Sequence, residues 1–118
     1  MKSVVLLLFL GFVFVTSEFE FKDGKIHDFG KVKVNSEVTY DFEFKNTSKE
    51  TIRILNLTTT CGCTVADYPK EVKAGEVAKI KAKYNSGGSP GVFKKYITVF
   101  TTGKEEFIKL TIHGEVIL

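Results

Sequence analysis

The chain has 118 residues, with 17 Lys and Arg against 14 Asp and Glu, which gives a formal net charge of +3. A charge this near neutrality gives no electrostatic drive toward nucleic acid or acidic membranes, so nucleic-acid binding is not expected. The length allows one ordinary domain with a single core. The two cysteines of the chain, Cys61 and Cys63, are separated by one glycine.

The N-terminal segment is typical of a secretory signal peptide. Lys2 gives it a positive start, residues 4–15 carry no charge, and we expect cleavage between Ser17 and Glu18. The apolar run has about a dozen residues, fewer than the roughly 20 of a membrane-spanning helix, although an uncleaved anchor stays open as an alternative. No cysteine follows the run directly, so a lipid anchor is not expected. The sequence predicts a signal peptide over residues 1–17, an extracytoplasmic location (periplasm or secreted) and no membrane contact beyond this segment.

After the signal, apolar and polar residues alternate, as they do in strands with one buried face. In residues 38–45 and 78–84, every second residue is apolar or aromatic. Turns rich in Gly, Asn and Ser separate the segments, and no stretch has a helical period. The pattern predicts strands over residues 19–22, 31–34, 38–45, 52–57, 64–67, 78–84, 92–101 and 108–118. Short strands at this spacing predict an all-β fold, an immunoglobulin-like β-sandwich of about seven strands. This domain is expected over residues 18–118, after an N-terminal signal helix.

Several short motifs follow one another along the chain. They are Thr60-Cys61-Gly62-Cys63-Thr64-Val65, Tyr68-Pro69, Gly75-Glu76, Tyr84-Asn85-Ser86, the run over residues 91–99, and Ile112-His113-Gly114-Glu115-Val116. With these motifs the chain resembles the domain of unknown function 1573 family over essentially all of its length after the signal. The resemblance implies a bacterial, mostly exported protein with an immunoglobulin-like sandwich and a Cys-Gly-Cys-Thr signature. That family is similar to major sperm protein-like and cilium-associated domains, and the resemblance implies no established activity.

The Cys61-Gly62-Cys63 triplet has three interpretations, of which the first is a disulfide. In an extended strand, residues two apart lie about 6.6 Å from each other at their Cα atoms. Bridged cysteines usually lie about 4.4–6.8 Å apart, so a turn at Gly62 would ease the bond. A ring this small would be strained and oxidising, which suits thiol–disulfide exchange. Such sites, however, place the nucleophilic cysteine at a helix start, and no helix is predicted near Cys61.

The second interpretation is a metal site, because two thiolates on one strand face suit a soft ion such as Cu(I). Zinc would need four ligands, and neither His27 nor His113 lies in an evident acidic cluster. The third interpretation, which we favour, is structural. Either as a disulfide or as two buried thiols, Cys61 and Cys63 pin a strand end, and Gly62 sets their geometry.

Other polar side chains receive structural explanations. The stripe formed by Lys79, Lys81 and Lys83 is expected to be a solvated face, or a sheet edge guarded by lysines, rather than a docking surface. The pair Lys94-Lys95 is interpreted in the same way. His113 is expected on the outward face of the last strand, and it and His27 are expected to be ordinary surface or hydrogen-bonded histidines.

The sequence shows no arrangement of nucleophile, base and acid typical of an enzyme, and it predicts no cofactor and no metal. We therefore expect a non-enzymatic, exported domain that binds an unidentified protein partner or serves as a structural module of the bacterial envelope. The alternative is a periplasmic thiol–disulfide or Cu(I)-handling protein that uses Cys61 and Cys63. The expected site is this disulfide or thiol pair with its motif residues Gly62 and Thr64. The loop over residues 86–91 is a weaker candidate contact.

Overall fold

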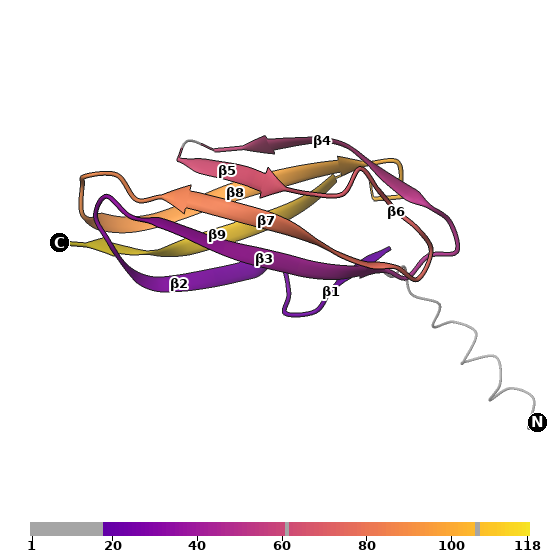
Figure 1. Cartoon of the computed structure of the whole chain (residues 1–118), viewed down its shortest axis with the longest axis horizontal. Coiled ribbons are helices and arrows are strands. Elements are labelled where there is room, and N and C mark those ends of the chain that lie inside the picture. Colours follow the sequence, from indigo (N-terminus) through magenta and orange to yellow (C-terminus); the bar gives the residue numbers. More distant parts are fainter. Residues whose placement is uncertain (1–17, 61, 106) are drawn as a thin grey trace, which may run out of the picture.

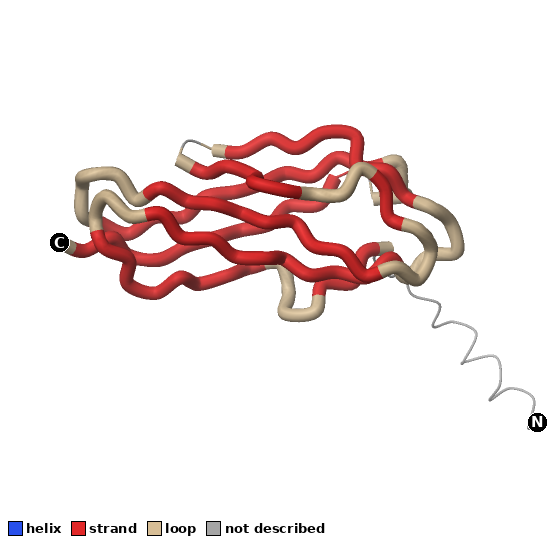
Figure 2. The backbone as a smooth tube through the Cα atoms, in the orientation of Figure 1, coloured by secondary structure: helices blue, strands red, loops and turns tan. Residues whose placement is uncertain are grey.

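The computed structural model describes residues 18–60, 62–105 and 107–118, and the predicted signal segment and Cys61 lie outside them. The described part consists of strands joined by turns (Figure 2). Over these residues there is no helix that could cross a membrane. The strands are β1 (Phe19–Phe21), β2 (Ile26–Lys33), β3 (Glu37–Asn46), β4 (Ile52–Thr59), β5 (Cys63–Asp67), β6 (Glu71–Val72), β7 (Val77–Asn85), β8 (Gly91–Thr101) and β9 (Phe107–Ile117).

The strands form two sheets packed face to face (Figure 1). One sheet has the order β1-β3-β7-β5, and all its neighbours are antiparallel. The other has the order β2-β9-β8-β4-β6, in which β2 and β9 are parallel and the remaining pairs are antiparallel. This arrangement confirms the predicted immunoglobulin-like β-sandwich.

The core lies between the sheets and is built by the alternation seen in the sequence. In β3, Phe42 and Phe44 are buried, whereas the intervening Glu43 reaches the outer surface. Burial of each large apolar side chain contributes about 1.5–3 kcal/mol, so these strands hold the sandwich together. The largest fully buried side chains are Phe19, Phe42, Phe44, Asn46, Val72, Ile80, Ile97, Val99, Leu110 and Ile112.

Strand β2 is longer than predicted: it begins at Ile26, whereas the sequence predicted a start at residue 31. A bulge between Asp28 and Lys31 shifts its register against β9. At the bulge, the Gly30 N–H donates a hydrogen bond to Asp28 Oδ1 at 2.8 Å. The bulge interrupts the alternation of side chains between the two faces. The first half of the strand alternates in burial, but the exposed Ile26 points outward and the half-buried His27 inward, so its apolar and polar residues do not follow the pattern on which the prediction depended.

Strand β6 was not predicted, because two residues are too few to show a pattern. It pairs with the start of β4 and contributes the fully buried Val72 to the core. Asn46, at the end of β3, is 0 % exposed and donates hydrogen bonds from Nδ2 to the carbonyls of Val72 and Glu50, both at 2.8 Å. Its Oδ1 accepts from the Ser48 N–H at 2.9 Å. One buried amide thus anchors both β6 and the β3–β4 loop.

Candidate functional site

Gly62 and Cys63 lie where the chain passes from one sheet to the other. β4 ends at Thr59 in the five-stranded sheet, and β5 begins at Cys63 in the four-stranded sheet (Figure 1). Thr60 is tied to β8, because its N–H donates to the Tyr96 carbonyl and its Oγ1 accepts from the Tyr96 N–H, both at 3.1 Å. The Cys63 N–H donates to the Thr60 carbonyl at 3.1 Å, which closes a tight turn.

Gly62 has a positive φ of 87°, a conformation that side chains other than glycine rarely adopt. Its carbonyl accepts from the Asn85 N–H at 3.1 Å, and a Cβ at this position would lie 3.4 Å from the Tyr84 ring. The Tyr84 ring in turn stacks on Phe93 of β8, with centroids 4.1 Å apart and planes 15° apart. The turn therefore rests on an aromatic stack that joins the two sheets.

Cys63 carries a free thiol and is 7 % exposed. Burial raises the pKa of this thiol, and the Thr64 backbone hydrogen bond and the nearby Lys95 only partly oppose the effect. The thiolate is the nucleophilic and metal-binding form, so a raised pKa disfavours both redox catalysis and Cu(I) binding by Cys63. Thr64 is exposed next to it on β5. Cys61 lies outside the described residues, so its disulfide with Cys63 stays a prediction.

The two histidines lie on neighbouring strands, β2 and β9. The His27 ring stacks on the Tyr40 ring of the opposite sheet, with ring centroids 3.6 Å apart. Burial lowers the pKa of His27, and the charge of Asp28 opposes this shift. His113 Nδ1 lies 3.7 Å from Asp28 Oδ1, a contact created by the parallel pairing of the two strands. Across residues 18–60, 62–105 and 107–118, no three His, Cys, Asp or Glu side chains form a group that could hold a metal ion.

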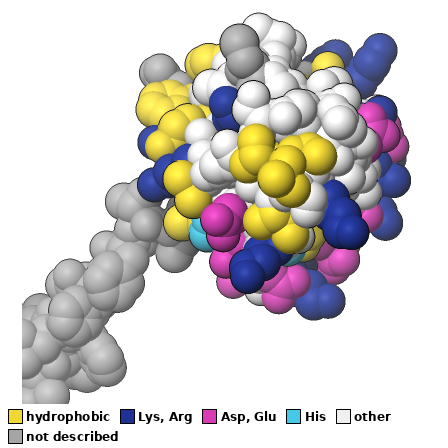
Figure 3. All heavy atoms as spheres, turned by 90° about the vertical axis from the view of Figure 1, so that its left-hand side faces the viewer, with side chains coloured by type: hydrophobic (Ala, Val, Ile, Leu, Met, Phe, Trp, Pro, Cys, Tyr) yellow, Lys and Arg dark blue, Asp and Glu magenta, His cyan; other side chains and the backbone are white. Residues whose placement is uncertain are grey.

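The glycine-rich loop between β7 and β8 lies at one end of the sandwich. Its first residue, Ser86, is buried; Ser86 Oγ donates to the Lys33 carbonyl at 2.7 Å and accepts from the Ser36 N–H at 2.9 Å. Residues 87–91 are exposed. Figure 3 shows this end of the molecule, where hydrophobic side chains lie exposed among charged ones. The base of the loop is thus fixed to the β2–β3 turn, and its tip faces solvent.

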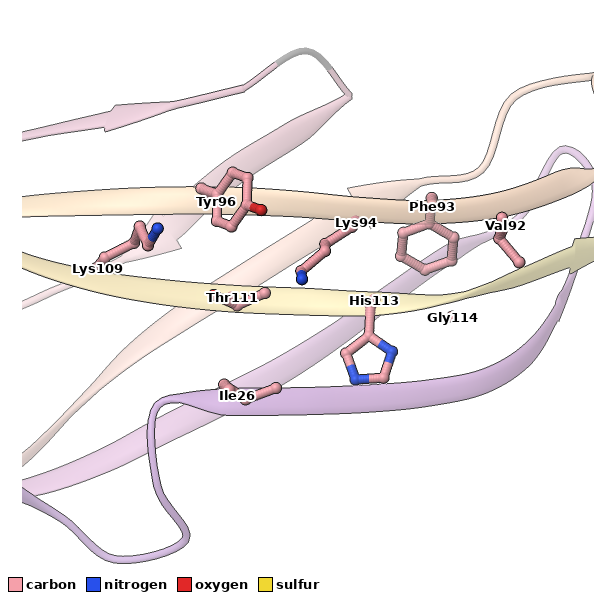
Figure 4. A pocket seen from close by; sticks show the side chains of 9 residues that line it. All are labelled: Ile26, Val92, Phe93, Lys94, Tyr96, Lys109, Thr111, His113 and Gly114. Carbon is pink, nitrogen blue, oxygen red and sulfur yellow. The ribbon is translucent and has the colours of Figure 1, made fainter.

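A shallow groove of about 690 Å³ lies on the outer face of β2, β9 and β8 (Figure 4). The alternation of side chains along β8 creates the groove. Ile97 points into the core, so Lys94 and Tyr96, at positions of the opposite parity, point outward. Tyr96 lies opposite Thr111, and Thr111 lies opposite Ile26, so these three residues form a row across three strands. The lining residues are Ile26, Val92, Phe93, Lys94, Tyr96, Lys109, Thr111, His113 and Gly114.

Gly114 allows two other groups to approach β9 closely. It lies opposite Phe93, and a Cβ on it would be 2.7 Å from the Gly30 carbonyl oxygen and 2.9 Å from the Phe93 ring. The bulge of β2 and the ring of Phe93 therefore both depend on bare backbone here. Gly114, Phe93, Tyr84 and Gly62 form a continuous line of contacts from the groove to the Cys-Gly-Cys turn, which we call the aromatic column.

Two of the three lysines of the β7 stripe have an ion-pair partner in their own sheet. Lys79 Nζ lies 3.9 Å from Asp41, and Lys83 Nζ lies 3.8 Å from Glu37, both carboxylates being on the adjacent β3. β7 lies between β3 and β5, so the explanation of the stripe as a guarded sheet edge is wrong. The stripe lies on the outer face of a central strand.

The lysines of the groove have no such partners. Among the residues that the structure describes, neither Lys94 nor Lys109 has a carboxylate oxygen within 4.0 Å of its ammonium group. The Lys109 ammonium lies instead 4.6 Å above the centroid of the Tyr96 ring. This cation–π contact orients both side chains at the groove.

The sequence interpretation did not identify this groove, whose residues come from β8, β9 and the strand β2, which is far from both in the chain. One signal was present. Outward positions of a strand are expected to be polar, yet β8 has Val92, Tyr96 and Phe100 at alternate positions of its outer face. Apolar residues on both faces of a strand indicate that its outer face is used.

Comparison with known structures shows the fold alone, because the identities of the structures described below are low. The chain is similar to a protein of unknown function from Porphyromonas gingivalis W83, with a TM-score of 0.70, 14% identity, and coverage of 86% of this chain and 49% of that one. It thus spans about half the length of that protein. It is also similar to the ASH / PapD-like domain of human CEP192 (PapD-like domain 7), with a TM-score of 0.69, 9% identity, and coverage of 90% and 95%. For the Vibrio cholerae VesB protease, the TM-score is 0.65 at 7% identity, with coverage of 86% and 32%.

Comparison at the sequence level gives a family. No curated protein matches the chain significantly. A family model described as "Protein of unknown function (DUF1573)" matches residues 19–116. The match covers nearly every described residue, and the chain therefore belongs to the DUF1573 family, with an immunoglobulin-like sandwich similar to PapD-like domains.

Proposed function

We propose that the chain is a non-enzymatic binding module of the bacterial envelope, and that the groove on β2, β9 and β8 holds its protein partner. The groove is the observation that supports this proposal. Val92 and Ile26, which line it, are 84 % and 63 % exposed, and Tyr96 lies in the same groove. Exposed apolar side chains gathered around a tyrosine are typical of protein interaction sites, because a partner removes them from water.

The same proposal gives the Cys-Gly-Cys-Thr signature a structural role. Cys63 is buried and its pKa is raised, which opposes the thiolate that redox or copper chemistry would need. Gly62 sets the turn between the sheets, and Thr64 begins the exposed edge of β5. The alternative function is thiol–disulfide exchange or Cu(I) handling by Cys61 and Cys63. The burial of Cys63 and its raised pKa favour the structural role over this alternative.

Export completes the proposal and is supported by the sequence of residues 1–17. Their positive start and uncharged apolar run are those of a signal peptide. In the oxidising environment outside the cytoplasm, a disulfide between Cys61 and Cys63 would be favoured. The partner that we propose is therefore a protein of the periplasm, the cell surface or the surroundings of the cell.

Site-specific photo-crosslinking in cells that make the protein tests this function. With benzoylphenylalanine in place of Tyr96, we expect a discrete adduct that disappears when Val92→Asp is added. The same probe at Lys81, on the outer face of the other sheet, should not give that adduct. Equal crosslinking from both positions, or none from position 96 in folded, exported protein, contradicts the proposal.

Replacement of both cysteines by serine separates the structural role from a chemical one. We expect the doubly substituted protein to have a lower Tm, because a buried side chain at Cys63 is altered. The adduct from position 96 should persist. Loss of the adduct in protein that is still folded at the temperature of the experiment would instead support a direct role of Cys61 and Cys63 in the function.

A further inference from the structure

We infer that the groove binds an extended acidic peptide segment whose two carboxylates are four residues apart, with an apolar or aromatic residue midway between them. This inference rests on the proposed function and names the chemistry of the partner. It is carried by the positions of two unpaired lysines on either side of a tyrosine. Figure 4 shows Lys109, Tyr96 and Lys94 following one another along the strands.

The register of the sheet sets the spacing of these cations. Lys94 lies opposite His113, Tyr96 lies opposite Thr111, and Lys109 lies opposite Thr98. The two lysines are therefore four residues apart along the strand direction, a distance of about 13 Å at 3.3 Å per residue. In an extended peptide, side chains at positions i, i+2 and i+4 point to the same side with the same spacing. A peptide lying along the strands would place one carboxylate at each lysine and its middle side chain at Tyr96.

The charges of the groove favour an anionic segment. Its lining contains two lysines and His113 and no carboxylate among the described residues. Two acids border the lining. Asp28 lies 3.7 Å from His113 and accepts a hydrogen bond from the Gly30 N–H at 2.8 Å, so it is already engaged on β2. Glu115 is exposed at the Val92 end of the groove, where it lies opposite Val92 on one side and Lys31 on the other. The three lysines of the β7 stripe, in contrast, each have a carboxylate of β3 beside them or across from them.

The row between the lysines explains why the middle residue should be apolar. Tyr96, Thr111 and the largely exposed Ile26 form an uncharged floor across three strands. An apolar side chain resting there would cover the Ile26 side chain and the Tyr96 ring. A nucleic acid strand, which carries a charge on every unit, would meet no cation in this row. A peptide with two separated carboxylates and an apolar residue between them fits it better.

The test uses the purified full chain and two synthetic peptides of identical composition. The first is Thr-Glu-Thr-Phe-Thr-Glu-Thr, with capped ends, and the second is Thr-Glu-Glu-Phe-Thr-Thr-Thr, in which the acids are adjacent. Binding is measured by chemical-shift changes of backbone amides in ¹⁵N-labelled protein. We expect the first peptide to bind the more tightly, with shifts concentrated in β8 and β9 and with affinity falling as salt is raised.

A matched pair of variants locates the binding. Lys94→Gln with Lys109→Gln should weaken binding of the first peptide on the order of tenfold, as loss of two exposed ion pairs predicts. Lys79→Gln with Lys83→Gln makes the same change in net charge on the other sheet and should alter affinity by less than about twofold. Retained Tm in both variants shows that folding is intact.

Four outcomes would overturn the inference. They are no binding of the first peptide, equal affinity for the two peptides, equal weakening by both pairs of variants, and shifts confined to other strands. Self-association abolished by the Lys94→Gln and Lys109→Gln changes would identify a second copy of the chain as the occupant and would also overturn it. If crosslinking from position 96 persists in cells while the peptides fail, the proposed function stands and only the peptide chemistry is wrong.

Discussion

Replacement of Gly114 by alanine tests whether the close packing of Gly30 and Phe93 against β9 requires a residue without a side chain at position 114. The new Cβ would lie 2.7 Å from the Gly30 carbonyl oxygen and 2.9 Å from two carbons of the Phe93 ring. Neither neighbour is the free end of a flexible side chain, because one is backbone and the other is a ring stacked on Tyr84. Either β2 or the ring must move, and both movements disturb packed structure.

The expected loss of stability follows from these contacts. Overpacking of a core costs about 1–3 kcal/mol, and each 1 kcal/mol shifts the Tm of a domain of this size by roughly 4–8 °C. We expect Gly114→Ala to lower the free energy of unfolding by about 2 kcal/mol and the Tm by roughly 8–16 °C. Thermal and urea unfolding, followed by circular dichroism, measures both quantities.

Gly88→Ala is the matched control. A Cβ at Gly88 would have the Asn35 side-chain oxygen as its nearest described neighbour, at 3.8 Å, which is ordinary van der Waals contact. We expect this substitution to change stability by less than about 0.5 kcal/mol. In a Phe93→Leu background, Gly114→Ala should become less destabilising by about 0.5–1 kcal/mol, because the ring is gone. Equal stability of the Gly114→Ala and Gly88→Ala proteins would refute the reasoning.

Three further predictions concern Cys63, Asn46 and His27. In a Cys61→Ser protein, Cys63 should react with a maleimide far more slowly when folded than in denaturant; equal rates would contradict its burial. Asn46→Ala should lower the free energy of unfolding by about 2–4 kcal/mol in urea titrations, because it leaves the buried Val72 carbonyl without its donor. Burial lowers the folded-state pKa of His27 below its ordinary 6.5, so the unfolded chain takes the proton first. The contribution of His27 to stability should therefore be complete above about pH 6.5, fall as the pH drops, and level off below the folded pKa. In His27→Phe, this part of the Tm decrease between pH 7.5 and 5 should vanish; an unchanged decrease would contradict it.

The sheets were predictable wherever one face of a strand is buried and the other is wet. β3, β7, β8 and β9 all show this alternation, and each was placed within about two residues, as the boundary reliability of pattern reading allows. The first half of β2 was missed because its outward position carries the apolar Ile26 and its inward position the polar His27, and because the bulge after Asp28 shifts the phase of the second half. β6 was missed because a two-residue strand is defined by its partner rather than by its own sequence.

The two parts of the candidate site, the Cys-Gly-Cys turn and the groove, also differ in how far the sequence predicts them. The position of the Cys-Gly-Cys turn follows from local chemistry, since Gly62 permits a backbone angle that other residues resist. The groove does not, because its residues meet only through the pairing of β2 with β9 and of β9 with β8. Likewise, the protonation of Cys63 depends on burial beneath neighbours from other strands, which a local motif cannot reveal.

The parallel pairing of β2 with β9 has a mechanical consequence. β2 is the first long strand and β9 the last, so tension applied to the two ends of the domain pulls these neighbours past each other along their length. Their hydrogen bonds are then loaded in shear and must break together rather than one after another. β1, which pairs with β3 over only three residues, would detach first and leave this clamp under load. A domain anchored at one end and gripped at the other would resist stretching without any further crosslink.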